Sequence, residues 1–367
     1  MPEVRSADET GPIERVVLSL VRMPKGPARY GVATRAALAM SMPVALLTLL
    51  GHQEIGLMTA AGAFTALFAA QASARERAKM LPFVMLAIML SALLGVWLTA
   101  WLWAYAIGLV GLAVATCALS YGFRLGPPGP VFFVLVYGLA ANVTALDDGE
   151  RFNSPLLFLA ATGAGCLFAY ALAILPLVMR AERARPARPL NQLFPGPWLG
   201  IDEQLMVLRV ALTSVIGTTI SVIWLDATHA YWTVCACIAV VGLTGSRLLS
   251  LTRGLHRTIG TLLGALLYLL IAPISDFPWA LVIALGVLQF IIEFVVVRNY
   301  ALALTFVTPL VLLITAAASP GDTTATALER VVDTVLGAAL AVLSAFIHRR
   351  PRTEESSSDP HSRIDRS

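Results

Sequence analysis

Residues 75–124 read RERAKMLPFVMLAIMLSALLGVWLTAWLWAYAIGLVGLAVATCALSYGFR, two apolar runs between a basic start and a closing Arg124. The runs cover 80–99 and 103–123, and about 20 apolar residues cross the roughly 30 Å of bilayer hydrocarbon. Their turn carries no charge but gathers Trp97, Trp101, Trp103 and Tyr105. Basic residues favour the cytoplasmic side, and Trp and Tyr favour the interfaces. The stretch therefore predicts two membrane-spanning helices joined by an outside turn with an aromatic belt.

The same alternation of charge continues along the chain. Lys and Arg occupy every second connection, whereas the others hold acids, His or no charge, with Arg151 as the exception. We expect an all-α, polytopic, multi-pass protein of the bacterial inner membrane, with about twelve transmembrane helices and both termini in the cytoplasm. The candidate spans are 33–51, 56–73, 80–99, 103–123, 131–146, 155–179, 204–225, 229–245, 257–274, 278–297, 300–317 and 325–347.

Composition excludes a soluble domain. The mean hydropathy is +0.79 and only 13% of residues are charged, about half the share usual in soluble proteins. The basic residues form no face interleaved with aromatics, so no nucleic-acid partner is expected. The four cysteines lie in apolar runs without a Cys-x-x-Cys pair, and neither a metal nor a cofactor is expected. Phosphate-binding loops, His-Glu-x-x-His and serine elbows are missing from the sequence, so we expect no enzyme.

The chain divides at a linker rich in Pro, Arg and Glu. We expect a cytoplasmic segment over 1–32, a six-span repeat over 33–179, the linker over 180–203, a second six-span repeat over 204–348 and a disordered tail over 349–367. Arg35 opens the first half as Arg209 opens the second. Six spans is an even number, so the halves share one orientation and are related by an axis along the membrane normal.

A shorter sequence repeat lies within the second half. Arg257, Gly260, Thr261 and Gly264 recur at the same spacing as Arg330, Asp333, Thr334 and Gly337. One interpretation is an inverted repeat of three plus three spans. The other is that small residues at four-residue spacing let helices pack closely. Both interpretations can hold together.

Four motifs carry a family resemblance. They are His229-Ala-Tyr231-Trp232-Thr, Arg257-Thr-Ile-Gly260-Thr-Leu-Leu-Gly264, Arg298-Asn299-Tyr300-Ala-Leu-Ala and Phe306-Val-Thr308-Pro309-Leu. Over roughly 205–347 the chain resembles the fusaric acid resistance family, which includes aromatic acid exporters and is similar to plant aluminium-activated malate channels. The first half matches weakly, since Pro130 stands where Arg298 would be. The resemblance implies export of small organic anions, aromatic carboxylic acids of the fusaric acid type, by proton-coupled antiport.

The twelfth predicted span carries charges that a bilayer disfavours. Arg330 and Asp333 are three residues apart, close enough for an ion pair within the helix. The functional alternative is a charge-compensated site in which Arg330 attracts a carboxylate and Asp333 exchanges a proton.

Polar side chains also precede the eighth span. Asp226 and His229 lie just before Tyr231 and Trp232. The ring pair alone is typical of an interfacial anchor. Because His titrates near neutral pH, His229 beside Asp226 is also a candidate external proton sensor. His52 with Glu54 occupies the matching turn of the first half, where the argument is weaker.

A second candidate cluster lies at the predicted cytoplasmic side. Glu293 stands about one turn before Arg298, and such residues at a span end snorkel and pair. The resemblance implies instead a vestibule for an anionic substrate. Its expected members are Arg298, Asn299 and Tyr300, with Arg253 and Arg257 as neighbours and Tyr300 able to stack on an aromatic ring.

Two other classes of function compete with the exporter. A passive anion channel would show a continuous basic lining and currents independent of a proton gradient. A non-transporting membrane scaffold in envelope assembly would tolerate removal of Arg330 and Asp333. The expected partners are the lipid bilayer, a small organic anion and protons, and a homo-oligomer is compatible with the sequence.

Overall fold

The computed structural model describes residues 18–20, 22–24, 29–147, 150–242, 247–318 and 322–347. This part is helical apart from a two-stranded ribbon, β1 (Leu146–Asp147) with β2 (Glu150–Arg151). The predicted tail over 349–367 and most of the predicted segment over 1–32 fall outside the described residues. The helices of the first half are α2 (Tyr30–Leu49), α3 (Gln53–Ala63), α4 (Ala74–Leu98), α5 (Leu102–Gly122), α6 (Val131–Val143) and α7 (Pro155–Ile174). Those of the second half are α10 (Ile201–Trp224), α11 (Ala230–Val241), α12 (Arg247–Ile271), α13 (Pro278–Val295), α14 (Tyr300–Ala318) and α15 (Thr323–Ser344).

The all-α membrane architecture is confirmed. Eight helices are long and apolar enough to cross a membrane, judged by length and composition among the described residues. Each of the twelve predicted segments contains one helix, but not all helices are of spanning length. The helix at the predicted span 56–73 ends at Ala63 and continues only as a 3-10 turn over Phe64–Leu67. The helix at 229–245 ends at Val241, before Gly242, whose φ is +58°.

The short helices lie inside the bundle. Almost every side chain of α3, α6 and α11 is buried, whereas the long helices expose large apolar side chains such as Leu156 and Leu270, both 77% exposed. Exposed leucines on this scale suit a hydrocarbon solvent. Trp97, Trp101 and Trp103 are exposed, as an interfacial belt requires. The expectation for Tyr105 was wrong, because it is buried and stacks on Tyr137 at 5.4 Å between ring centroids.

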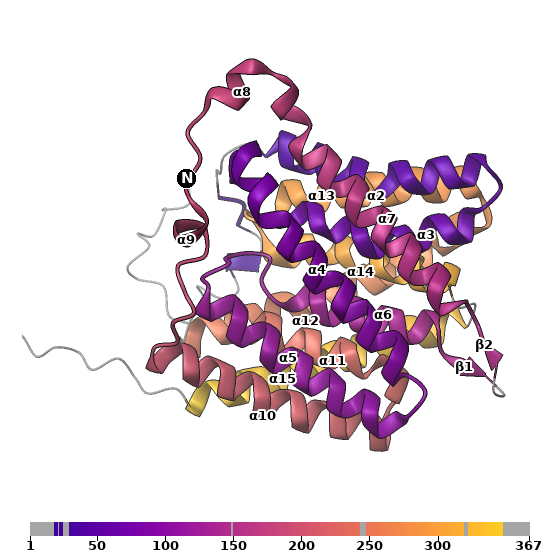
Figure 1. Ribbon diagram of the computed structural model, residues 1–367. Helices are drawn as coiled ribbons and strands as arrows, with labels where there is room; N and C mark the ends of the chain where they lie inside the picture. Colours follow the sequence, from indigo (N-terminus) through magenta and orange to yellow (C-terminus); the bar gives the residue numbers. More distant parts are fainter. Residues whose placement is uncertain are drawn as a thin grey trace, which may run out of the picture.

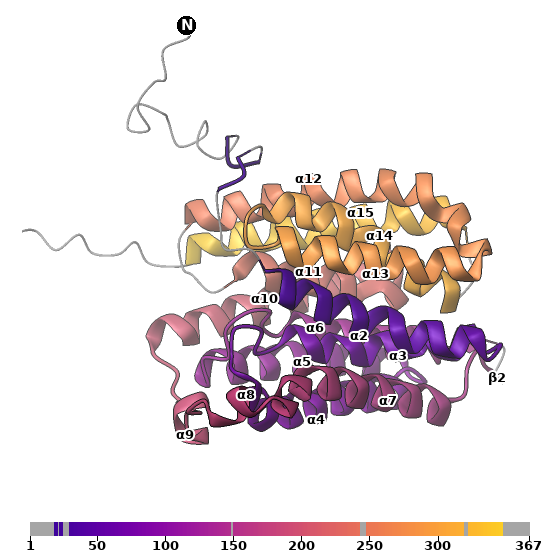
Figure 2. The same ribbon diagram turned by 90° about the horizontal axis from the view of Figure 1, so that it is seen from above.

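The two halves interlock through reciprocal contacts. The first helix of each half packs against the fourth helix of the other, so α2 lies on α13 and α10 lies on α5. Within each half, the second helix packs on the sixth and the third packs on the fifth. Figure 2 shows α12 to α15 on one side of the bundle and α2 to α7 on the other, with α10 and α11 between them.

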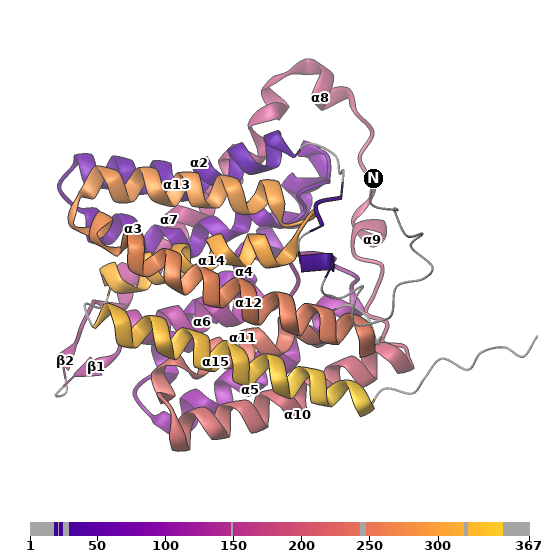
Figure 3. The same cartoon turned by 180° about the vertical axis from the view of Figure 1, so that it is seen from behind.

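The bundle has two chemically different ends. The linker, with α8 (Arg180–Ala184) and α9 (Leu190–Leu193), lies at one end, and the β1–β2 ribbon lies at the other (Figures 1 and 3). The Arg188 Nε lies 2.7 Å from the Glu76 Oε1, which ties the linker to the start of α4. We call these the linker end and the ribbon end.

Candidate functional site

The first turn of α11 and the middle of α15 are held in contact by a glycine. A Cβ at Gly337 would collide with the Thr233 carbonyl oxygen, so only Gly allows α15 to approach α11 this closely. The approach places Arg330 and Asp333 against the start of α11. Both side chains are almost fully buried, at 3% and 2% exposure. Asp333 lies ten residues into α15, roughly 15 Å along its axis, near the middle of the helix.

Arg330 and Asp333 do not form the ion pair that their spacing allows. Asp333 Oδ1 accepts a hydrogen bond from the Thr233 hydroxyl at 2.7 Å. The Arg330 guanidinium turns instead to Trp232, with Cζ 5.0 Å from the ring centroid. Among the described residues no salt bridge joins the two charges. A cation–π contact with buried Trp232 therefore takes the place of the predicted pair.

Several buried donors around Arg330 are left without a protein acceptor. Within the described part of the chain, no hydrogen-bond partner is found for Nε and Nη1 of Arg330, Nε1 of Trp232 or the Tyr231 hydroxyl. Buried polar groups are nearly always hydrogen-bonded, so donors without a partner mark the place of a water or a ligand. All of these groups donate hydrogen bonds or carry positive charge, which suits an anion.

A second buried guanidinium reaches the same region from α12. Arg257 donates from Nη1 to the Tyr300 hydroxyl at 3.0 Å, while its Nε has no partner among the described residues. Arg257 and Arg330 are close enough to repel each other. The Asp333 carboxylate attracts Arg330, but within the described residues no salt bridge neutralises either guanidinium group. The structure thus brings together Arg257 and Tyr300, as the resemblance implied, and adds Arg330.

The other residues predicted at the cytoplasmic side make contacts of their own. Asn299 caps α14 by accepting from the Leu302 N–H at 2.9 Å, and donates to the Leu20 carbonyl at 2.7 Å. Arg298 lies over the Phe294 ring at 4.4 Å. Glu293 lies 3.8 Å from Arg29 rather than forming the anticipated pair with Arg298. These contacts hold the N-terminal segment, α13 and α14 together.

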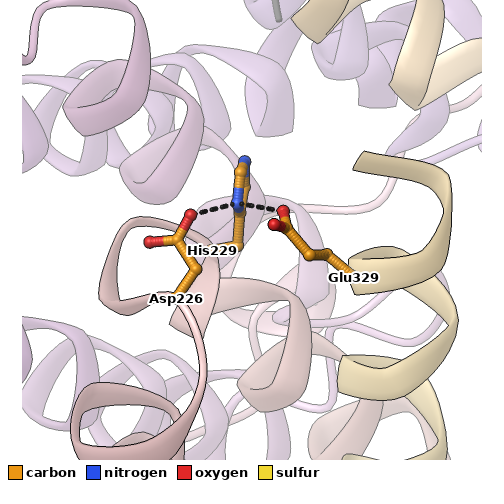
Figure 4. Close-up of side chains that lie close together, drawn as sticks. All are labelled: Asp226, His229 and Glu329. Atoms are coloured by element: carbon orange, nitrogen blue, oxygen red, sulfur yellow. Dashed lines mark hydrogen bonds and ion pairs between the residues drawn. The ribbon is translucent and has the colours of Figure 1, made fainter. Parts of the chain in front are cut away.

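His229 bridges two acids at the ribbon end. Its Nδ1 lies 2.9 Å from Asp226 Oδ2 and 3.2 Å from Glu329 Oε2 (Figure 4). The His229 ring also stacks on Trp232, with centroids 4.1 Å apart and planes inclined by 16°. Burial by itself raises the pKa of the Asp226 carboxyl, but hydrogen bonds from His229 and Thr228 outweigh it and the pKa falls to about 2. Asp226 is therefore ionised at neutral pH, and its contact with His229 is confirmed.

Two polar residues of the region were not among the predicted site residues. Glu329 precedes Arg330 in the sequence. It contacts His229 because this part of α15 packs against the turn between α10 and α11. Arg209 is fully buried and joins three helices: Nε donates to Ser344, and Nη2 contacts Ser250 and the Ala341 carbonyl. The signal for Arg209 is a charge within an apolar run, which also marks it as buried and bonded.

The first half repeats the packing of this region without its charges. Gly165 on α7 meets the Thr59 carbonyl of α3, as Gly337 meets Thr233. Phe158 and Ala161 precede Gly165 by seven and four residues. Arg330 and Asp333 precede Gly337 by the same intervals. Phe158 is fully buried and Ala161 is 5% exposed. The apolar pair fills in the first half the position that the charged pair occupies in the second.

Comparison with known proteins supports the motif assignment. Residues 210–344 match the family model described as fusaric acid resistance protein-like. The predicted resemblance is confirmed for this region. The matched region contains all ten predicted site residues, from Asp226 to Asp333.

One curated relative extends the similarity, and it is also a membrane protein. The uncharacterized membrane protein YvaC of Bacillus subtilis (strain 168) is 30% identical over 215 residues. The alignment covers 55% of this chain but only 33% of the length of that relative. No solved structure matches the chain. The matched region, the apolar helices and this relative identify a multi-pass membrane protein.

Proposed function

We propose that this protein exports small organic anions, aromatic carboxylic acids among them, across the bacterial inner membrane by proton-coupled transport. The transport site in this proposal lies between α11, α12 and α15. Arg330 and Arg257 bind the carboxylate, Tyr231 and Trp232 contact the ring, and Asp333 carries the proton. In this proposal the linker end faces the cytoplasm, because its connections are basic.

The observation that carries the proposal is the pair of buried guanidinium groups without an ion pair. A charge at the centre of a bilayer costs at least about 2.5–3.5 kcal/mol on the scale from insertion experiments. Arg330 contacts Trp232 and Arg257 contacts Tyr300, but neither contact neutralises the charge. A bound carboxylate would neutralise one guanidinium and accept from donors that have no other acceptor.

The surrounding side chains favour an aromatic acid over a small inorganic anion. Tyr231 and Trp232 are fully buried beside Arg330, with ring centroids 5.6 Å apart. Aromatic pairs bind a further ring by stacking or by edge contacts. A substrate with a carboxylate on an aromatic ring would satisfy both the charge and the ring surface. The family description supports the same substrate class.

Asp333 supplies a group that can link proton and anion movement. Its charge attracts Arg330, and its described hydrogen bond comes from the Thr233 hydroxyl. When Asp333 is ionised it competes with a substrate carboxylate for Arg330. When it is protonated, the net charge of the site rises by one unit. The protonation state of Asp333 therefore changes the affinity of the site for an anion.

The space beside the site favours a conformational cycle over an open channel. The void next to Tyr231 measures about 10 Å³ and is lined by mostly apolar side chains of η1 (Phe64–Leu67), α6, α11 and α14. Such a space is about the size needed for one water molecule. An aromatic acid can reach Tyr231 only after these helices separate. Alternating access of this kind distinguishes an exporter from the channel alternative.

Flux in liposomes tests the proposal. Purified protein would be reconstituted into vesicles loaded with salicylate, benzoate or fusaric acid, and efflux would be followed with and without an imposed pH gradient. We expect efflux that accelerates with the gradient, falls at least tenfold in Arg330→Gln and loses its response to the gradient in Asp333→Asn. Thr59→Val serves as a control for Thr233→Val, because Thr59 occupies the matching position in the first half.

The rival functions give different results. Efflux that follows voltage and ignores the pH gradient would establish the passive channel. No movement of any acid by a correctly inserted, monodisperse protein would leave the non-transporting scaffold. Wild-type rates in Arg330→Gln would remove that residue from the pathway.

A further inference from the structure

A second site of different chemistry lies at the ribbon end. Asp226 begins the short η3 turn (Ala227–His229), His229 ends it, and Glu329 comes from α15. Figure 4 shows the imidazole between the two carboxylates, with both dashed lines meeting at the same ring nitrogen. The three ligand atoms lie within 4.8 Å of one another. The side chains remain reachable, since 13% of His229, 37% of Asp226 and 40% of Glu329 is exposed.

One imidazole nitrogen cannot fully satisfy both acids. A neutral Nδ1–H donates a single hydrogen, so one carboxylate keeps an unshared negative charge. Neither Asp226 nor Glu329 forms a salt bridge to Lys or Arg among the described residues. A divalent cation would bond to Nδ1 and to one oxygen of each acid at once, and would neutralise both charges.

The separations from the imidazole nitrogen are close to those of a metal centre. Zinc binds His nitrogen at about 2.0–2.1 Å and carboxylate oxygen at about 2.0–2.2 Å in tetrahedral geometry, which places neighbouring ligand atoms roughly 3.3 Å apart. The distances from Nδ1 are 2.9 Å to Asp226 and 3.2 Å to Glu329. Small outward movements would therefore admit the ion. Three protein ligands leave a fourth position open to water or to an anion.

Neighbouring contacts orient the ligands beforehand. The stack on Trp232 fixes the plane of the His229 ring and turns Nδ1 toward the acids. The N–H and the hydroxyl of Thr228 both donate to Asp226 Oδ1 at 2.8 Å. Supporting contacts of this type raise metal affinity because fewer side chains must be ordered on binding.

We propose that Asp226, His229 and Glu329 bind a divalent transition-metal ion of the zinc type, which clamps the α10–α11 turn to α15 at the ribbon end. The three ligands are not members of the proposed anion site, although His229 stacks on Trp232, and the metal proposal does not depend on the transport function. It adds a ligand that the sequence did not predict, because Glu329 is a hundred residues from His229.

Zinc binding to the full-length protein tests the proposal directly. Tag-free protein in lipid nanodiscs would be titrated with Zn²⁺ by calorimetry. We expect about one equivalent bound by wild type, and affinity at least tenfold weaker in His229→Gln, Glu329→Gln and Asp226→Asn. His52→Gln is the matched control, because His52 occupies the corresponding turn of the first half, and it should bind as wild type does.

X-ray absorption of the zinc-loaded wild type gives a readout independent of any variant. Its first shell should contain one imidazole nitrogen with oxygen ligands at about 2.0–2.2 Å. The proposal is overturned if wild type takes up no more Zn²⁺ than Glu329→Gln does. It is also overturned if a shell of sulfur or of several imidazoles appears, since the ion would then lie elsewhere.

Discussion

The guanidinium of Arg330 lies over the indole of Trp232, 5.0 Å from its centroid, and forms no salt bridge within the described chain. Two roles for a buried arginine can be separated on this basis. A structural arginine is bonded to the groups it holds together, and its removal weakens the fold. An arginine reserved for a ligand forms few hydrogen bonds to the protein, and its removal weakens binding.

Arg330→Gln should therefore abolish transport without lowering thermal stability. The change removes a buried charge that has no ion pair, and an unpaired buried charge destabilises the fold. We expect an unchanged or higher Tm in detergent, together with at least a tenfold loss of aromatic acid efflux. A clear drop in Tm would instead assign Arg330 to the structure.

Arg209→Gln should behave in the opposite way. Arg209 donates to Ser344, Ser250 and the Ala341 carbonyl, and one hydrogen bond to a charged group contributes about 1.5–3 kcal/mol. We expect the free energy of unfolding to fall by roughly 2 kcal/mol or more. The change is measured as a lower Tm and a lower yield of folded protein. Arg35→Gln is the control from the first half, because Nε and Nη2 of Arg35 have no partner among the described residues. Equal losses in both variants would contradict the distinction.

Close packing by glycine can be tested on a single helix. A Cβ at Gly165 would collide with the Thr59 carbonyl, whereas at Gly163 the nearest atoms belong to Met89 at 3.8 Å. Gly165→Ala should lower the free energy of unfolding by about 1–3 kcal/mol, because the added methyl group overpacks the interface. Gly163→Ala should be neutral or stabilise by up to about 1 kcal/mol, because Ala favours the helix. Thermal unfolding of the two variants side by side measures the difference, and the prediction fails if both are tolerated.

The orientation can be measured by cysteine labelling. The native cysteines are all buried, so a membrane-impermeant maleimide should react only with introduced thiols. We expect Asp276→Cys to be labelled from outside intact cells and Arg183→Cys only after lysis, since basic connections stay in the cytoplasm. Both positions are exposed. Reversed labelling would invert the proposed direction of the whole bundle.

The sequence was informative wherever charge or spacing decided the outcome. Apolar runs between alternating basic connections located the twelve main helices, and the resemblance of the motifs placed Arg257 next to Tyr300. Helix length was a different matter, because an apolar run looks the same whether lipid or protein surrounds it. The end of α11 at Gly242 and the early end of α3 follow from packing inside the bundle, which the composition of 229–245 and 56–73 does not encode.

Contacts between distant segments were the other limit. The spacing of Arg330 and Asp333 allowed an ion pair, but Trp232 and Thr233 compete for the two side chains from another helix. Glu329 reaches His229 only because Gly337 draws α15 onto α11. These outcomes depend on tertiary geometry, and local spacing cannot rank them.

Phe158 and Ala161 stand in the first half where Arg330 and Asp333 stand in the second, while the Gly–Thr contact beneath them is kept in both. We infer that the two halves arose by duplication and fusion of one six-helix unit. The first half then needs only to keep its helix packing, whereas the charged groups of the second half carry the proposed chemistry. Under the proposed function, substitutions that change substrate preference are therefore expected between 210 and 344.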